Sequence, residues 1–78
     1  MTDEKYNGWT NRSTWNTALW LFNSQSRYAM MRDIFSNKEA TPKTAETFCR
    51  GTFGKKTPDG HSLDVVDWKE IAAAINEQ

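Results

Sequence analysis

Few side chains in this chain have the chemistry of a catalytic group. A nucleophile needs a neighbouring base, and the sequence offers one cysteine, Cys49, and one histidine, His61. Cys49 falls in the middle of a predicted helix, on its apolar face, so it is interpreted as a small buried hydrophobe. His61 stands alone in a polar loop and is interpreted as a solvated side chain. The pattern therefore predicts a protein that is not an enzyme.

Motifs for phosphate and metal binding are incomplete. Gly54-Lys55-Lys56-Thr57 is superficially similar to a phosphate-binding loop, but the first glycine of that motif is missing and no evident buried strand precedes it. One cysteine and one histidine cannot form a zinc-ligand cluster. We therefore expect no catalytic residue, no cofactor and no metal.

The charge balance weakens a nucleic-acid hypothesis without removing it. Ten basic and ten acidic side chains give a formal net charge of zero. Proteins that bind nucleic acid through its phosphates are usually basic, and a mimic of nucleic acid should be acidic. Arg50, Lys55 and Lys56 can still form a local basic patch at the end of a helix. A small nucleic-acid-binding accessory protein therefore stays open as an alternative function.

The length of 78 residues predicts one small domain. Residues 1–6 are polar, and the longest apolar run, residues 18–22, is too short to cross a bilayer. We therefore expect no signal peptide, no membrane association and a cytoplasmic location, which the unpaired cysteine also favours. Residues 1–8 are predicted to be a flexible lead, and residues 9–78 a single helical domain.

The elements that position these side chains are predicted to be helices. The first helix is expected to be capped by Thr10 or Asn11 and to end near residue 22. The second is expected to be capped by Ser24 or Ser26 and to end near residue 35. A third starts at Thr41-Pro42 and runs to about residue 53. The inward stripe expected for the first helix is Trp15, Ala18, Leu19 and Phe22. The stripe expected for the second is Tyr28, Met31, Ile34 and Phe35.

The last helix has the clearest start. Asp67 is its cap, and Glu70, three residues later, is expected to complete a capping box. Val66 and Ile71 are placed to form a hydrophobic staple. The sequence thus predicts an all-α fold, a compact bundle of three to four short helices around a Trp/Phe-rich core. The core residues that we expect are Trp9, Trp15, Leu19, Phe22, Phe35, Phe48, Trp68 and Ile71.

A second architecture fits the region between the last two helices. Pro58-Asp59-Gly60 is a tight-turn sequence, and residues 63–66 alternate in polarity. A short hairpin would pair residues 52–53 with residues 63–66 across that turn. The alternative to the all-α bundle is therefore an α+β fold with a hairpin around residues 52–66.

Trp20 lies off the main stripe of the first helix, so it either contacts a second helix or is exposed. An exposed tryptophan is typical of an interface anchor, and arginines often accompany it. The candidate protein-binding residues are therefore Arg12, Trp20, Arg27 and Arg32. This prediction makes surface contacts, and not chemistry, the basis of function.

Two sequence elements resemble a known family. Tyr6-Asn7-Gly8-Trp9-Thr10-Asn11 with Thr14-Trp15-Asn16, and the closing Val66-Asp67-Trp68-Lys69-Glu70-Ile71-Ala72, are similar to small uncharacterised proteins of bacteriophages, plasmids and bacteria. The resemblance covers about a third of the chain, at its two ends. It implies a mobile-element gene that is expressed inside a bacterium. It also implies that Trp9, Trp15 and Trp68 pack the first helix against the last.

The function that we expect is non-enzymatic binding and inhibition of a bacterial host protein. The most concrete targets are defence systems, such as a CRISPR effector complex, which would make the protein anti-CRISPR-like, or a restriction enzyme. A second alternative, besides nucleic-acid binding, is a self-associating structural or assembly protein. The expected oligomeric state is a monomer or a small homo-oligomer.

Overall fold

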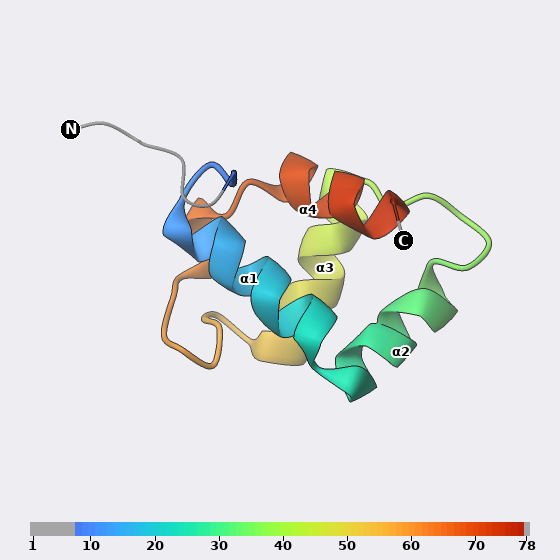
Figure 1. Cartoon of the computed structure of the whole chain (residues 1–78), viewed down its shortest axis with the longest axis horizontal. Coiled ribbons are helices and arrows are strands. Elements are labelled where there is room, and N and C mark those ends of the chain that lie inside the picture. Colours follow the sequence, from blue (N-terminus) through green and yellow to red (C-terminus); the bar gives the residue numbers. More distant parts are fainter. Residues whose placement is uncertain (1–7, 78) are drawn as a thin grey trace.

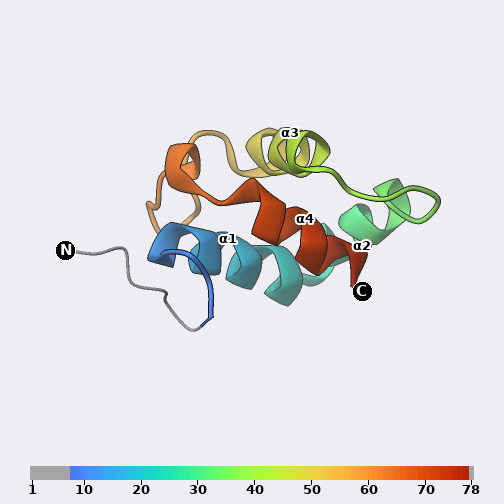
Figure 2. The same cartoon turned by 90° about the horizontal axis from the view of Figure 1, so that it is seen from above.

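The computed structural model describes residues 8–77, so the predicted lead lies outside the described residues apart from Gly8. The elements in this part of the chain are α1 (Arg12–Asn23), α2 (Gln25–Ile34), α3 (Pro42–Phe53), the 3₁₀ helix η1 (Leu63–Val65) and α4 (Trp68–Asn76). α4 lies between α1 and α3 and packs on both (Figure 2). α2 packs on α1 and diverges from α3 (Figure 1). Residues 8–77 contain no strand, and the predicted all-α bundle is confirmed.

Each α-helix begins at a capping residue that the sequence marks. The caps are Asn11, Ser24, Thr41 and Asp67, and each side chain accepts a hydrogen bond from a backbone N–H of its first turn. Pro42 follows Thr41 in the first helical position, where its missing N–H costs nothing. The helix starts are therefore local properties of the sequence.

The capping box predicted for α4 is only half formed. Asp67 Oδ1 accepts the Lys69 and Glu70 N–H groups at 3.1 and 3.3 Å. The Glu70 carboxylate turns instead to the Thr10 N–H, at 2.8 Å. The Asp67 N–H donates to Thr14 Oγ1 at 2.9 Å. The partners come from the start of α1, so these hydrogen bonds tie the beginnings of α1 and α4 together.

The buried face of α1 is rotated by one residue, about 100°, from the predicted stripe. The buried residues of α1 are Thr14, Asn16, Thr17, Ala18 and Leu21. Four of them repeat the expected i, i+3, i+4, i+7 spacing, but from Thr14 and not from Trp15. Trp15 and Leu19 are half-buried beside that face. The Thr14 and Thr17 hydroxyls donate to acceptors near the start of α1, at 2.7 and 2.8 Å, so their burial leaves no unmade hydrogen bond.

The centre of the core is aliphatic. Its buried apolar residues are Ala18, Leu21, Met31, Ala40, Ala45, Cys49, Leu63, Val66, Ile71, Ala72 and Ile75. The half-buried rings that pack against them are Trp9, Phe22, Tyr28, Phe35, Phe48, Phe53 and Trp68. Of the predicted core residues, Ile71 lies in the centre, and five aromatic side chains pack around that centre: Trp9, Phe22, Phe35, Phe48 and Trp68. The prediction of Trp15 and Leu19 as core residues is wrong, because the rotation of α1 leaves both half-buried. A small domain has little interior, and large rings are rarely enclosed completely.

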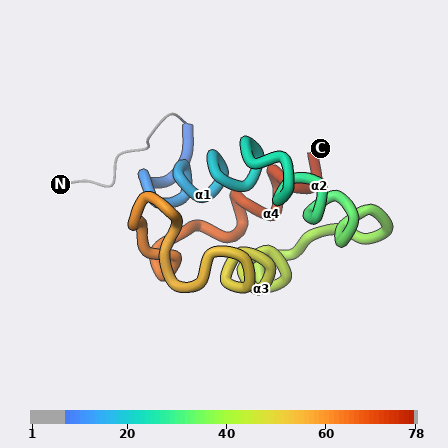
Figure 3. The backbone as a smooth tube through the Cα atoms, turned by 90° about the horizontal axis from the view of Figure 1, so that it is seen from below, coloured from blue at the N-terminus to red at the C-terminus, as the bar shows by residue number. Residues whose placement is uncertain are grey.

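Residues 54–66 close the end of the molecule between α1 and α3 (Figure 3). The predicted alternative hairpin is wrong, because α3 continues to Phe53 and η1 occupies residues 63–65. The pairing that this segment does show is one isolated antiparallel bridge between Lys56 and Ser62. Leu63 and Val66 are buried while Val65 is exposed, as expected when residues three apart share one side of a 3₁₀ turn.

None of the helices within residues 8–77 is long and apolar enough to cross a membrane.

Candidate protein-interaction surface

Cys49 has no access to substrate and little nucleophilic character. It is completely buried, and burial raises the pKa of its thiol to about 12. At neutral pH the side chain is therefore a neutral thiol, which confirms its interpretation as a buried hydrophobe. His61 is half-buried in the loop before η1. Within residues 8–77, no three His, Cys, Asp or Glu side chains lie close enough together to hold a metal ion.

Arg50 is engaged with two carboxylates and does not extend an open basic patch. Its Nε lies 2.8 Å from Glu46 Oε2 and its Nη2 lies 3.0 Å from Asp64 Oδ1. The hydrogen bonds to Glu46 and Asp64 raise the pKa of Arg50 above its ordinary value. Arg50 thereby joins η1 to α3. Lys55 and Lys56, the other residues of the predicted patch, are exposed in the loop that follows α3.

Trp20 and Arg27, two of the predicted binding residues, meet on the surface. The Arg27 Cζ lies 5.9 Å from the centre of the Trp20 ring and 4.7 Å from that of Phe53. The Trp20 Nε1–H donates to Asp59 Oδ2 at 3.0 Å. Trp20, Arg27, Phe53 and Asp59 are called the Trp20 cluster below. Phe53 and Asp59 were not predicted to belong to it, because the chain brings them back to α1 and α2 only through its tertiary fold.

Asp59 fixes the loop before η1 onto α1. Its Oδ2 accepts a second hydrogen bond from Asn16 Nδ2 at 2.9 Å. This bond sets the orientation of the Asn16 amide, whose buried Oδ1 has no hydrogen-bond partner within residues 8–77. The hydrogen bonds from Asn16 and Trp20, with a smaller attraction to His61, lower the pKa of Asp59 below its ordinary value.

This loop attachment is expected to weaken in acid. Because the pKa of Asp59 is lower in the folded than in the unfolded state, its stabilising contribution is complete above the ordinary value of about 3.9 and is lost as pH falls through the folded value. In ¹H–¹⁵N spectra, the Trp20 indole N–H and the Asn16 side-chain amide should titrate together with a midpoint below about 3.9. Asp59→Asn should remove the shared transition. A midpoint at or above the ordinary value would contradict the assignment.

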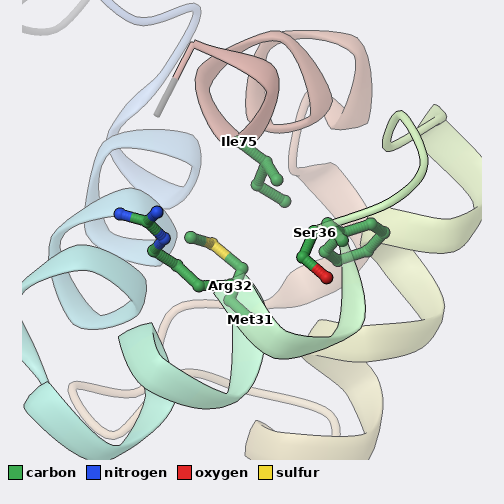
Figure 4. Close-up of a pocket in the computed structure, with 5 residues that line it drawn as sticks. Met31, Arg32, Ser36 and Ile75 are labelled. Atoms are coloured by element: carbon green, nitrogen blue, oxygen red, sulfur yellow. The ribbon is translucent and has the colours of Figure 1, made fainter.

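The other two predicted binding residues lie elsewhere. Arg12 is exposed at the first position of α1, about two helical turns from Trp20. Arg32 lies at the edge of a small pocket of about 170 Å³, toward which Ile75 of α4 points (Figure 4). The pocket is lined by Met31, Arg32, Phe35, Ser36 and Ile75. The structure thus brings together Trp20 and Arg27, and neither Arg12 nor Arg32 belongs to their cluster.

A larger, open groove lies between the end of α2 and the first half of α3, and we call it the α2–α3 groove. Its volume of about 540 Å³ falls within the range of ligand-binding clefts. It is lined by Ile34, Phe35, Lys38, Thr41, Lys43, Thr44, Thr47 and Phe48. The Phe35 and Phe48 rings meet edge to face, with centres 6.2 Å apart, and so join the two sides of the groove.

Large apolar side chains are exposed along α2 beside this groove. Met30 and Ile34 lie one helical turn apart and are 49% and 42% exposed, and Ile34 lines the groove itself. The prediction that Ile34 faces the core is wrong: its side chain is exposed and lines the groove. The reason is that α2 packs on α1 and diverges from α3 (Figure 1).

Separate contacts hold the two walls of the α2–α3 groove in place. The Ala40 N–H donates to Asn76 Oδ1 at 2.7 Å, and Asn76 Nδ2 donates to Ala40 O at 3.0 Å. This pair anchors the loop before α3 to the end of α4. The rings of Phe22 and Tyr28, 6.3 Å apart and edge to face, hold α2 against α1. The groove is therefore formed before any partner binds.

These features define a class, a small all-α domain with a preformed groove between two diverging helices. The chain belongs to a family of unknown function, DUF7249, which matches residues 2–78. No curated protein and no solved structure matches the chain.

Proposed function

We propose that this protein acts without catalysis, by binding a bacterial host protein at the α2–α3 groove and inhibiting it. The observation that supports the proposal is the exposure of Ile34, which lines a preformed groove, and of Met30 one helical turn before it. Exposed apolar side chains beside a cleft with a polar rim are typical of interaction sites. Methionine suits such a site because its flexible side chain adapts to a partner.

The proposed setting is the bacterial cytoplasm, which follows from the resemblance to mobile-element proteins. The most concrete target is a defence system, either a CRISPR effector complex or a restriction enzyme. Inhibition would occur by occlusion: a segment of the target occupies the groove, and the bound domain blocks access to the target's own substrate. Arg27 lies on the same side of α2 as Met30 and Ile34, so the Trp20 cluster would extend the contact at its other end.

The test uses one pair of matched substitutions in the full chain. Ile34→Glu places a charge in the groove, whereas Val65→Glu makes a comparable change at a 56% exposed position on η1. Each tagged variant is used for capture from a bacterial lysate and is expressed in CRISPR-interference and restriction assays. Ile34→Glu should lose inhibition by about tenfold or more, as for a central interface residue. Val65→Glu should behave as the wild type.

Two outcomes would remove this function. In the first, the wild-type chain captures no host protein and alters neither defence assay. In the second, Ile34→Glu captures and inhibits as well as Val65→Glu does, which would place the contact outside the α2–α3 groove.

A further inference from the structure

We propose that the occupant of the α2–α3 groove is an amphipathic helix of the partner, with apolar side chains facing Ile34 and Phe48 and carboxylates facing Lys38 and Lys43. This inference rests on the proposed protein-binding function and adds the chemistry of the partner segment. It follows from the shape, the apolar walls and the charge of the groove.

The apolar part of the surface has the spacing that a helix recognises. Met30 and Ile34 follow each other by one turn along α2, and Ile34 lines the groove together with Phe48 of α3. On the side of α3 the groove is lined from Thr41 to Phe48, a rise of about 10 Å, so it can support a partner helix of about two turns. A helix bound in a groove contacts it through residues at i, i+3, i+4 and i+7, which form one apolar stripe. The groove therefore suits the apolar face of such a helix.

The charge on the groove is of one sign, although the chain as a whole is neutral. Lys38 and Lys43 line the groove, together with three threonines, and no carboxylate does. Three of the acidic residues are engaged elsewhere, since Glu46 and Asp64 bind Arg50 and Glu70 binds the Thr10 N–H. Asp33 and Glu39, near the end of α2, are exposed but do not line the groove. Neither groove lysine forms an ion pair within the part of the chain that the structure describes. Carboxylates of a partner would form ion pairs with these two lysines.

The position of Lys43 points in the same direction. Lys43 lies in the first turn of α3, where the helix dipole favours anions, and that turn contains no acidic residue. A cation there adds to the positive potential of the helix start and is unfavourable for the isolated domain. A carboxylate of a bound partner would offset the repulsion between Lys43 and the positive end of the helix dipole. The unfavourable position of Lys43 therefore supports an acidic occupant.

Two other occupants fit the same observations less well. A nucleic acid would place phosphates near Lys38 and Lys43, but it would leave Met30 and Ile34 without an apolar partner. A second copy of this chain, related by a two-fold axis through the groove, would bring the same lysines toward each other. Both occupants are distinguished by the experiment below.

The probes are three fluorescent helical peptides with the same leucine stripe and with glutamate, glutamine or lysine along its edges. Their binding to the full chain is followed by fluorescence anisotropy at low and high salt. We expect the glutamate peptide to bind about tenfold more tightly than the lysine peptide at low salt, because two exposed ion pairs are gained. Added salt should reduce that difference.

Charge-reversal variants show which lysines cause the preference for the glutamate peptide. Lys38→Glu with Lys43→Glu should invert it, so that the lysine peptide binds more tightly. Lys55→Glu with Lys56→Glu makes the same change in charge on another exposed pair and should leave the preference unchanged. Ile34→Glu should weaken all three peptides, and Val65→Glu should weaken none. Circular dichroism of each variant checks that the fold is retained.

Several results would overturn the inference: equal binding of the three peptides, binding that Ile34→Glu does not weaken, or a DNA or RNA oligonucleotide that binds through Lys38 and Lys43. A dimer in sedimentation that Ile34→Glu disrupts would assign the groove to a second copy. Host-protein capture that depends on Ile34, together with equal peptide binding, overturns this inference alone. A clear glutamate preference with no inhibition of a host protein overturns the proposed function alone.

Discussion

Replacing Ile71 with alanine is expected to remove most of the free energy of unfolding of this domain. Ile71 is fully buried on α4, the helix that packs on both α1 and α3. Removing such a side chain costs about 2–5 kcal/mol, because apolar contacts are lost and a cavity remains. A domain of this size is usually stable by only about 3–5 kcal/mol. The higher helix propensity of alanine returns less than about 0.7 kcal/mol, so the loss dominates.

Urea unfolding followed by circular dichroism measures this effect. Val65→Ala is the matched control, since Val65 is 56% exposed and its truncation should change the free energy of unfolding by less than about 0.5 kcal/mol. If Ile71→Ala cost no more than this control, the core around α4 would have to be packed differently from the structure described above.

The sequence predicts where the helices start because capping is a local interaction. Asn11, Ser24, Thr41 and Asp67 each bind backbone N–H groups no more than three residues ahead. Polar side chains of this kind stabilise a helix start in any tertiary context. The all-α class follows from the same signals together with apolar residues at helical spacing.

The rotation of α1 is a tertiary property and was predicted wrongly. Apolar periodicity favours Trp15 and Leu19 as core residues, whereas the fold buries Thr14 and Thr17. What permits this burial is a set of hydrogen bonds, one of which joins Thr14 to the Asp67 N–H, 53 residues away. Such a partner cannot be read from local spacing. The alternative strand at residues 63–66 does not form for a similar reason, since Leu63 and Val66 both face the core.

The residues that the sequence predicted for protein binding, Arg12, Trp20, Arg27 and Arg32, do not line the α2–α3 groove at which we propose binding. The groove depends on the direction in which α2 leaves α1. Ile34 is exposed because of this direction. The hydrogen bonds between Ala40 and Asn76 fix the position of the loop before α3, and therefore the position of the α3 side of the groove. One signal was available in advance, the cation Lys43 directly after Thr41-Pro42, where a helix start favours an acidic residue.

Replacing Thr14 with valine is expected to cost about 1–3 kcal/mol, even though the two side chains are nearly the same size. Thr14 is completely buried, and its hydroxyl donates to Asn11 Oδ1 at 2.7 Å while it accepts the Asp67 N–H at 2.9 Å. Valine has no oxygen to accept a hydrogen bond from the Asp67 N–H. That N–H would then be left unsatisfied where the starts of α1 and α4 meet. The cost comes from this unsatisfied donor, because a buried polar group loses its hydrogen bond to water as well.

Thr17→Val is the matched control for this prediction. Thr17 lies one turn further along the same face and is equally buried, but its hydroxyl donates to Ser13 O within α1 itself. Removing a hydroxyl that bonds back to its own helix should cost less than about 1 kcal/mol. Urea unfolding compares the two variants, and amide hydrogen exchange at Lys69 and Glu70 reports whether the start of α4 opens. Equal losses in both variants, with unchanged exchange in α4, would mean that the hydrogen bond between Thr14 and Asp67 does not hold α1 against α4.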